Sequence, residues 1–186
     1  IYSELQQYDS ALYDFDKALS FDSLNSYGLF SKAITYMKMK DFDKALVNLN
    51  KVTQLSPYNS YAYFNRAIIY QNKNDLPKAL TDFSVVIQLN PENIMSHFYR
   101  GLIYSELKQF EKAEKDLSKT IELYPLYTNA YRERSRVRGE LQNEKGAYDD
   151  FKKIEELQAG NGVDEIPKTK EMAEYLHSIV TLSGSF

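Results

Sequence analysis

A period of 34 residues runs along this chain and constrains its fold more than any other feature. Pro57, Pro91 and Pro125 follow one another at intervals of 34 residues. The same interval separates the tyrosines Tyr2, Tyr36, Tyr70 and Tyr104, the alanines Ala11, Ala45, Ala79, Ala113 and Ala147, and the large apolar residues Phe15, Leu49, Phe83, Leu117 and Phe151. Series that keep one register over most of a chain indicate a repeat protein, in which each unit buries its apolar face against the next.

Each period predicts two antiparallel helices that cross closely. Small residues mark the crossing, because helix axes about 8–10 Å apart leave no room there for a large side chain. In the first helix these residues are Ala33, Ala67, Gly101 and Ser135, and they oppose the alanine series of the second helix. The prolines end each second helix, since the residue before a proline is disfavoured in the helical region. Pro77 instead stands at the start of a second helix, where its missing N–H costs little.

A small residue in each helix, aromatic residues around the crossing and a closing proline resemble the tetratricopeptide repeat (TPR) family. The resemblance covers roughly residues 1–159 and implies an all-α fold, an α-α superhelix of about four and a half helical hairpins. It also implies that the chain is a fragment of a larger array. The expected segments are a truncated repeat at 1–25, full repeats at 26–59, 60–93 and 94–127, and a degenerate repeat at 128–159.

The residues after the last repeat predict one further helix. We expect a linker at 160–166, an amphipathic helix at 167–181 and a loose tail at 182–186. Met172, Leu176, Ile179 and Val180 share one side of that helix. The helix either caps the open end of the array or docks in a groove of its own or of a neighbouring molecule.

A polar series follows the same period. The seventh place of each full repeat holds a cation: Lys32, Arg66, Arg100 and Arg134. Sixteen residues later stand Asn48, Asp82, Asp116 and Asp150. We expect partly buried arginine–aspartate pairs that join helices by charge-assisted hydrogen bonds, within a repeat or between adjacent ones. The alternative is an anion-binding site.

The resemblance further implies that the first helices line a concave groove where a ligand binds. Residues spaced at i, i+3, i+7 and i+10 share one helical face. In three successive first helices that face is Tyr27, Phe30, Ile34 and Met37, then Tyr61, Phe64, Ile68 and Gln71, then Met95, Phe98, Leu102 and Ser105. An apolar, aromatic surface favours a protein or peptide partner. The alternative is that these residues only pack against the neighbouring first helix.

The same face changes chemistry in the last repeat. There it carries Asn129, Arg132 and Arg136. A groove that is apolar along most of its length and basic at one end suits a peptide with an acidic end. The alternative is a solvated, charged helix.

One subclass of the family binds the carboxyl terminus of a chaperone through lysine, asparagine and arginine side chains. Only Asn65 falls at a matching place in this chain. The lysine and arginine places hold Phe30, Ile34, Met95 and Tyr99. A cochaperone of that type is therefore not expected.

Composition argues against most other functions. A net charge of −3 and a sequence pI near 5.5 do not indicate a nucleic-acid partner. Without cysteine, and with His97 and His177 as the only histidines, neither a metal site nor a catalytic triad is expected. We expect no enzyme activity, no cofactor and no insertion into a membrane, since no apolar run is long enough to span one.

The leading hypothesis is a protein–protein interaction module or scaffold. The alternative is a regulatory or self-assembling segment of a larger protein, which could form a homo-oligomer through its terminal hairpin or its C-terminal helix. The repeat pattern does not specify the partner or the cellular compartment, because one scaffold serves many functions.

Overall fold

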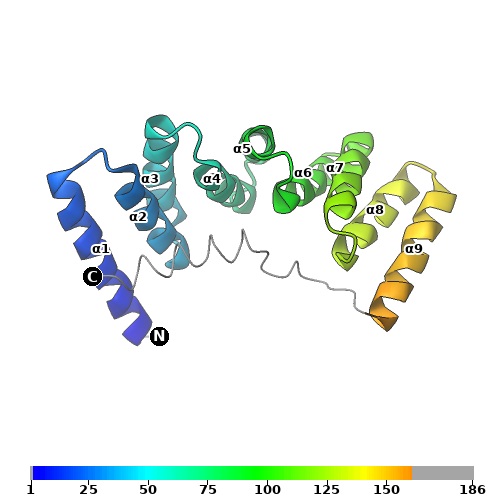
Figure 1. The fold of residues 1–186 in the computed structure, drawn as a ribbon, viewed down its shortest axis with the longest axis horizontal. Coiled ribbons are helices and arrows are strands. Elements are labelled where there is room, and N and C mark those ends of the chain that lie inside the picture. Colours follow the sequence, from blue (N-terminus) through cyan, green and yellow to red (C-terminus); the bar gives the residue numbers. More distant parts are fainter. Residues whose placement is uncertain (1, 161–186) are drawn as a thin grey trace. The chain divides into compact units, whose positions relative to one another are not determined.

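The computed structural model describes residues 2–160, with side chains from residue 7 onward. These residues form nine α-helices joined by short turns (Figure 1). The helices are α1 (Tyr2–Phe21), α2 (Ser26–Lys38), α3 (Phe42–Leu55), α4 (Ser60–Asn72), α5 (Leu76–Leu89), α6 (Ile94–Glu106), α7 (Phe110–Leu123), α8 (Thr128–Glu140) and α9 (Glu144–Ala159). The fold is therefore all-α, as the period predicts.

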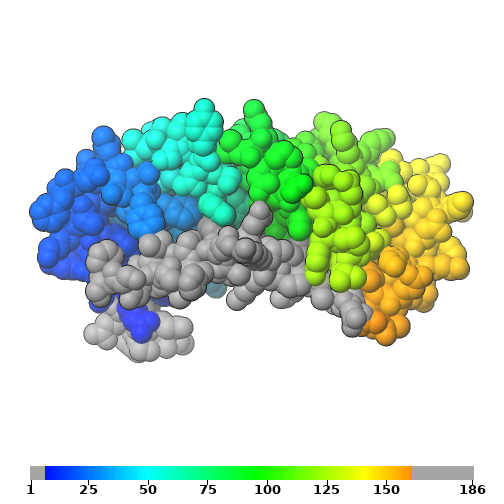
Figure 2. Space-filling model, viewed as in Figure 1, coloured from blue at the N-terminus to red at the C-terminus, as the bar shows by residue number. Residues whose placement is uncertain are grey.

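The helices divide between two compact units. Unit 1 contains α1 to α4 and unit 2 contains α5 to α9. In the hairpins α2–α3, α6–α7 and α8–α9, a first helix contacts the second helix that follows it. The side chains of neighbouring helices within a unit fill the space between them (Figure 2).

Asparagine side chains begin the first helices at the repeat interval. Asn25, Asn59 and Asn93 each accept a hydrogen bond from the backbone N–H three residues later, at 2.8, 3.1 and 2.9 Å. Such a cap satisfies one of the backbone donors that every helix start leaves without a partner. Tyr127 stands at the same place before α8, which has no side-chain cap.

The turn inside each hairpin follows the period as well. Lys40, Asn74, Lys108 and Gln142 adopt positive φ angles of 61°, 59°, 56° and 58°. A left-handed residue lets a helix end and the chain reverse. Of the four, only Asn74 is a residue type that favours this conformation, so the sequence gives little warning of the turn.

The small residues lie at the helix crossings, as expected. Ala33, Ala45 and Ala113 are fully buried. A Cβ atom added to Gly101 would come within 3.1 Å of Leu117 Cγ, so even an alanine at the α6–α7 crossing would require the Leu117 side chain to shift.

The large apolar residues of the period differ in burial between the inner helices and α9. Leu49, Phe83 and Leu117 are fully buried, but Phe151 on α9 is 51% exposed. Tyr148, one turn earlier, is 56% exposed. Among the described residues no later helix packs on that side of α9.

The segment 1–25, which the sequence predicts to be a truncated repeat, contains a single helix. A remnant of a first helix followed by a second helix would need a turn, but α1 runs unbroken from Tyr2 to Phe21. A few residues of a first helix bury too little surface to fold back, and a continuous helix keeps every backbone hydrogen bond.

The degenerate repeat at 128–159 forms a complete hairpin, α8–α9, despite its departures from the pattern. The expected linker beyond Gly160, the helix at 167–181 and the tail at 182–186 lie outside the described residues. None of the helices between residues 2 and 160 has the length and apolar character that a membrane span requires.

Candidate functional site

The first-helix face of unit 1 presents aromatic side chains to solvent. Tyr27 on α2 and Tyr61 on α4 occupy the same place of successive repeats and are 44% and 45% exposed. Phe30, Met37, Phe64 and Ile68 are half-buried on the same helices. Together these six residues form what we call the unit 1 face.

Two predicted binding residues of unit 1 are buried instead. Ile34 is 7% exposed and Asn65 is 8% exposed. The Asn65 amide donates a hydrogen bond of 2.7 Å to the backbone oxygen of Tyr61, one turn earlier in α4. Their burial makes both residues part of the helix packing.

The first-helix face of unit 2 combines apolar and basic residues. Met95 and Leu102 on α6 are half-buried, and Arg132 and Arg136 on α8 are exposed. These four residues form what we call the unit 2 face. Arg136 Nη2 donates a hydrogen bond of 3.1 Å to Ser105 Oγ and so joins α8 to α6.

Phe98 belongs to the core of unit 2. It is 7% exposed, and its ring meets the Tyr127 ring edge-on with centroids 4.9 Å apart. Spacing along a helix places Phe98 near the predicted groove, but the ring turns toward the start of α8.

The polar series forms a network that holds neighbouring helices together. Arg100 donates from Nε and Nη2 to the Asp116 carboxylate, at 2.7 and 2.8 Å, and from Nη1 to Ser84 Oγ at 3.0 Å. One guanidinium on α6 therefore bonds to α7 after it and to α5 before it. Bidentate contacts of this kind fix geometry as well as charge.

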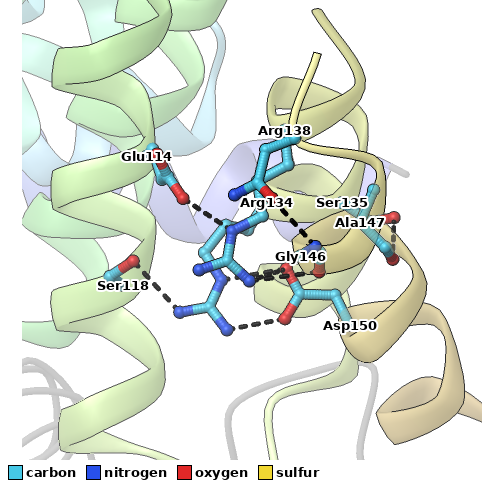
Figure 3. Close-up of polar contacts among 9 residues, drawn as sticks. Glu114, Ser118, Arg134, Ser135, Arg138, Gly146, Ala147 and Asp150 are labelled. Atoms are coloured by element: carbon cyan, nitrogen blue, oxygen red, sulfur yellow. Dashed lines mark hydrogen bonds and ion pairs between the residues drawn. The ribbon is translucent and has the colours of Figure 1, made fainter. Parts of the chain in front are cut away.

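Arg134 repeats the arrangement one period later (Figure 3). Its Nε and Nη2 donate to Asp150 at 3.0 and 2.6 Å, and its Nη1 donates to Ser118 Oγ at 3.0 Å. In unit 1, Arg66 Nη1 donates to Asn50 Oδ1 and Thr53 Oγ1 at 2.9 and 2.7 Å, and Lys32 pairs with Asp16. Asp82 of unit 2 is 3% exposed.

The predicted partner sixteen residues after the cation is present for Arg100 and Arg134, but the sequence interpretation missed the partner sixteen residues before each cation. Those earlier partners are Asp16, Asn50, Ser84 and Ser118, which themselves recur every 34 residues. Three of the five N–H groups of Arg100 and of Arg134 donate to the protein in this way. This occupancy favours a structural role for both arginines over an anion site.

Asp150 holds a second arginine that the sequence interpretation did not assign. Arg138 Nη1 donates to Asp150 Oδ2 at 3.0 Å, and Arg138 Nε donates to Glu114 Oε1 on α7 at 2.6 Å (Figure 3). Arg138 stands where earlier repeats have a tyrosine. The Asp150 carboxylate, only 2% exposed as a residue, thus joins two cations of α8 to α9.

Asp116 is ionised despite its burial. Burial alone would raise the pKa of this carboxyl group, but hydrogen bonds from Arg100 and the contact with His97 outweigh that effect and place the pKa below its usual range. His97 Nδ1 lies 3.2 Å from Asp116 Oδ1, and its Nε2 lies 3.0 Å from the Pro91 backbone oxygen. His97 is therefore held inside the core, and its two ring contacts leave it no evident catalytic role.

Asp116 should make stability depend on pH. A carboxyl group whose pKa is lowered by folding adds stability above its unfolded pKa of about 3.9, and this contribution is lost as the pH falls through the folded-state pKa. At neutral pH, Asp116→Asn, which cannot ionise, should have a lower urea midpoint of unfolding than the wild type. The difference between the two midpoints should become smaller below about pH 4. Urea unfolding followed by circular dichroism at several pH values measures this difference. Asp149→Asn, at an exposed position of α9, is the control. A difference in urea midpoint between Asp116→Asn and the wild type that stays constant with pH would contradict the expectation.

Between residues 2 and 160, no three histidine, aspartate or glutamate side chains converge in a way that could hold a metal ion. Two of the buried acidic residues, Asp116 and Asp150, are engaged by arginines instead. Consecutive helical hairpins with an open first-helix face define a helical-repeat scaffold.

The chain belongs to the tetratricopeptide repeat family. Family models described as tetratricopeptide repeat match residues 27–59, 60–93 and 95–127, which together make up more than half of the chain. Proteins of this family are generally scaffolds that bind proteins or peptides, and generally not catalysts. No curated protein sequence is significantly similar to the chain.

Solved structures share the fold. A crystal structure of MamA is 24% identical, with a TM-score of 0.77 over 82% of this chain and 89% of that one. YrrB, described as a TPR protein with an unusual peptide-binding site, is 16% identical, with a TM-score of 0.75 over 95% of this chain and 86% of that one. The first TPR of Spaghetti (RPAP3), bound to an HSP90 peptide, is 27% identical, with a TM-score of 0.60 over 65% of this chain and 96% of that one.

Proposed function

We propose that this chain binds a protein or peptide segment along the first-helix faces of its repeats. The observation that carries the proposal is the pair Tyr27 and Tyr61. Both rings are nearly half exposed at the same place of successive first helices, while the core of unit 1 is built by other residues. Exposed aromatic residues in register favour binding, since tyrosine is enriched among the residues that dominate interface energies.

The unit 2 face supports the same function with different chemistry. Met95 and Leu102 are apolar, while Arg132 and Arg136 offer exposed positive charge. Such a surface would take a segment that has apolar residues next to acidic ones. The similar folds of YrrB, described as having a peptide-binding site, and of the RPAP3 TPR, described as bound to an HSP90 peptide, agree with this class of ligand without naming the partner.

The test uses a displayed peptide library selected on the 186-residue chain. Tyr27→Glu combined with Tyr61→Glu should weaken the selected peptides about tenfold or more, because a charge replaces a buried ring in the complex. Tyr13→Glu combined with Tyr58→Glu is the matched control. Both of these tyrosines belong to unit 1, are 70% and 86% exposed, and lie outside the first helices.

Circular dichroism and urea unfolding establish that each variant remains folded. Phe98 is unsuitable for this test, because a change to glutamate would disrupt the core of unit 2. Selected peptides that bind the Tyr27/Tyr61 variant as tightly as the control variant would refute binding at the unit 1 face.

Self-association is a second candidate, favoured by α9. Tyr148 and Phe151 leave a large apolar area exposed on that helix. Light scattering over a range of concentrations would show a dimer, and Phe151→Glu would abolish it if α9 forms the interface.

A further inference from the structure

Helix α8 carries four arginines, of which two bond to buried acids. Arg134 and Arg138 bond to the buried Asp150, whereas Arg132 and Arg136 are exposed on the unit 2 face. Arg136 pairs with Glu133 of its own helix at 2.9 Å. An exposed pair of this kind contributes little, so the guanidinium can still attract an acidic group.

The basic residues border an apolar surface. The Arg136–Ser105 hydrogen bond places the middle of α8 beside the end of α6. Leu102 lies one turn before Ser105, and Met95 lies two turns earlier on the same face of α6. A ligand that crosses from α8 to α6 therefore meets positive charge first and apolar side chains next.

The chain leaves unit 2 near the basic residues. Helices α8 and α9 form an antiparallel hairpin (Figure 1). Because α8 has 13 residues and α9 has 16, the last turn of α9, with Leu157, runs back to the first turn of α8. Gly160 therefore lies at the end of α8 that carries Arg132. Four further residues can extend about 13 Å, so residue 164 can reach the unit 2 face.

After Gly160 the sequence has acidic residues first and apolar residues next, which complements the order of basic and apolar residues on the unit 2 face. Residues 161–186 lie outside the described residues, but their sequence places Asp164 and Glu165 first. Ile166 and the predicted amphipathic helix at 167–181 come next, with its apolar stripe. Acidic residues at the exit, followed by apolar ones, match a surface that is basic at the exit and apolar beyond it.

We propose that this chain's own segment from residue 164 onward occupies the unit 2 face, with Asp164 and Glu165 paired to Arg132 and Arg136. Ile166 and the apolar residues after it then cover Leu102 and Met95. The inference rests on the proposed function, because it assigns an occupant to one of the two binding faces. A tethered segment is present at high effective concentration, so an external peptide must displace it to bind unit 2.

The absence of cysteine makes a direct test possible. A nitroxide spin label attached to Thr169→Cys in the full chain reports which amide signals lie near the segment in NMR spectra. Signals of Leu102 and Arg136 should lose intensity through paramagnetic broadening. Signals of Glu111 and Lys115, exposed on the second helix α7, should keep theirs.

Charge reversal tests the pairing. Arg132→Glu with Arg136→Glu should abolish the broadening, and the further changes Asp164→Arg and Glu165→Arg should restore it. Unbroadened Leu102 and Arg136 signals in the labelled wild type, or broadening that survives the arginine changes, would overturn the proposal.

A mixture of spin-labelled chains and isotope-labelled chains without the nitroxide separates the two sources of the segment. Broadening in that mixture would mean that a second copy supplies the segment, which would overturn the assignment to the same chain. Peptide binding at Tyr27 and Tyr61 is measured separately in unit 1. Failure of the tethered segment would therefore leave peptide binding at the unit 1 face standing, and the two failures can be told apart.

Discussion

Asp150→Ala is expected to lower the free energy of unfolding by about 3–5 kcal/mol, the usual cost of leaving buried charges without their partner. Asp150 accepts bonds from both Arg134 and Arg138, whose side chains are only 14% and 19% exposed. Removing the carboxylate leaves two poorly solvated guanidinium groups close together. Urea unfolding followed by circular dichroism measures the change.

The neighbouring Asp149→Ala is the matched control for Asp150→Ala. Asp149 is exposed on the same helix, so this change should cost about 0.5 kcal/mol or less. Arg138→Ala should cost less than Asp150→Ala, because the Asp150 carboxylate keeps its two bonds to Arg134. Equal unfolding midpoints for the two aspartate variants would show that the network adds no stability.

Phe83→Ala is expected to cost about 3–5 kcal/mol, because it removes a fully buried ring and leaves a cavity. Phe151→Ala is an unusually close control, since the same residue type stands at the same place of the repeat in the same unit. Phe151 is half exposed, and its loss should cost about 1 kcal/mol or less. Thermal and urea unfolding of both variants measure the difference.

Equal costs for the two phenylalanines would carry a specific meaning. They would show that Phe151 is covered in solution, either by residues after Gly160 or by a second copy of the chain. Repeating the Phe151→Ala measurement over a range of protein concentrations would separate these two cases, because only self-association depends on concentration.

The hairpins could be predicted from the sequence because several independent series share one period. The repeat predicted at 26–59 contains α2 and α3, which run from Ser26 to Leu55. Alanine, glycine and serine at the crossings leave few alternatives, since a large side chain there would separate the helices. The acids of the Arg100–Asp116 and Arg134–Asp150 pairs could be foreseen for the same reason, as their spacing repeats with the helices.

The binding faces could be predicted only in part. A spacing of i, i+3 and i+7 defines a helical face, but that face is wide enough for one edge to be covered by a neighbouring helix. Phe98 and Ile34 lie toward the covered edge, whereas Tyr27 and Tyr61 lie toward the open one. Which edge is covered depends on how successive hairpins are rotated, and no residue series encodes that angle.

Two periodic features were present in the sequence without being recognised. The left-handed residues Lys40, Lys108 and Gln142 are types that the turn does not favour, so only their 34-residue spacing could have revealed it. Ser84 and Ser118 are small polar residues common on helix surfaces. Their role depends on an arginine from the next hairpin, which is a long-range contact.

Arg100 and Arg134 each bond to the helix before their own and to the helix after it. This arrangement affects how a chain of this kind can gain or lose repeats. Suppose that residues 94–127 were duplicated and the copy inserted after Tyr127. The copy of Arg100 would then have Ser118 sixteen residues before it and the copy of Asp116 sixteen residues after it. Arg134 would in turn meet the copied serine. Recombination in steps of one whole hairpin therefore preserves every pairing, whereas any other step would separate buried arginines from their acids. The row of first-helix faces can therefore be lengthened by addition of hairpins, with no compensating change elsewhere.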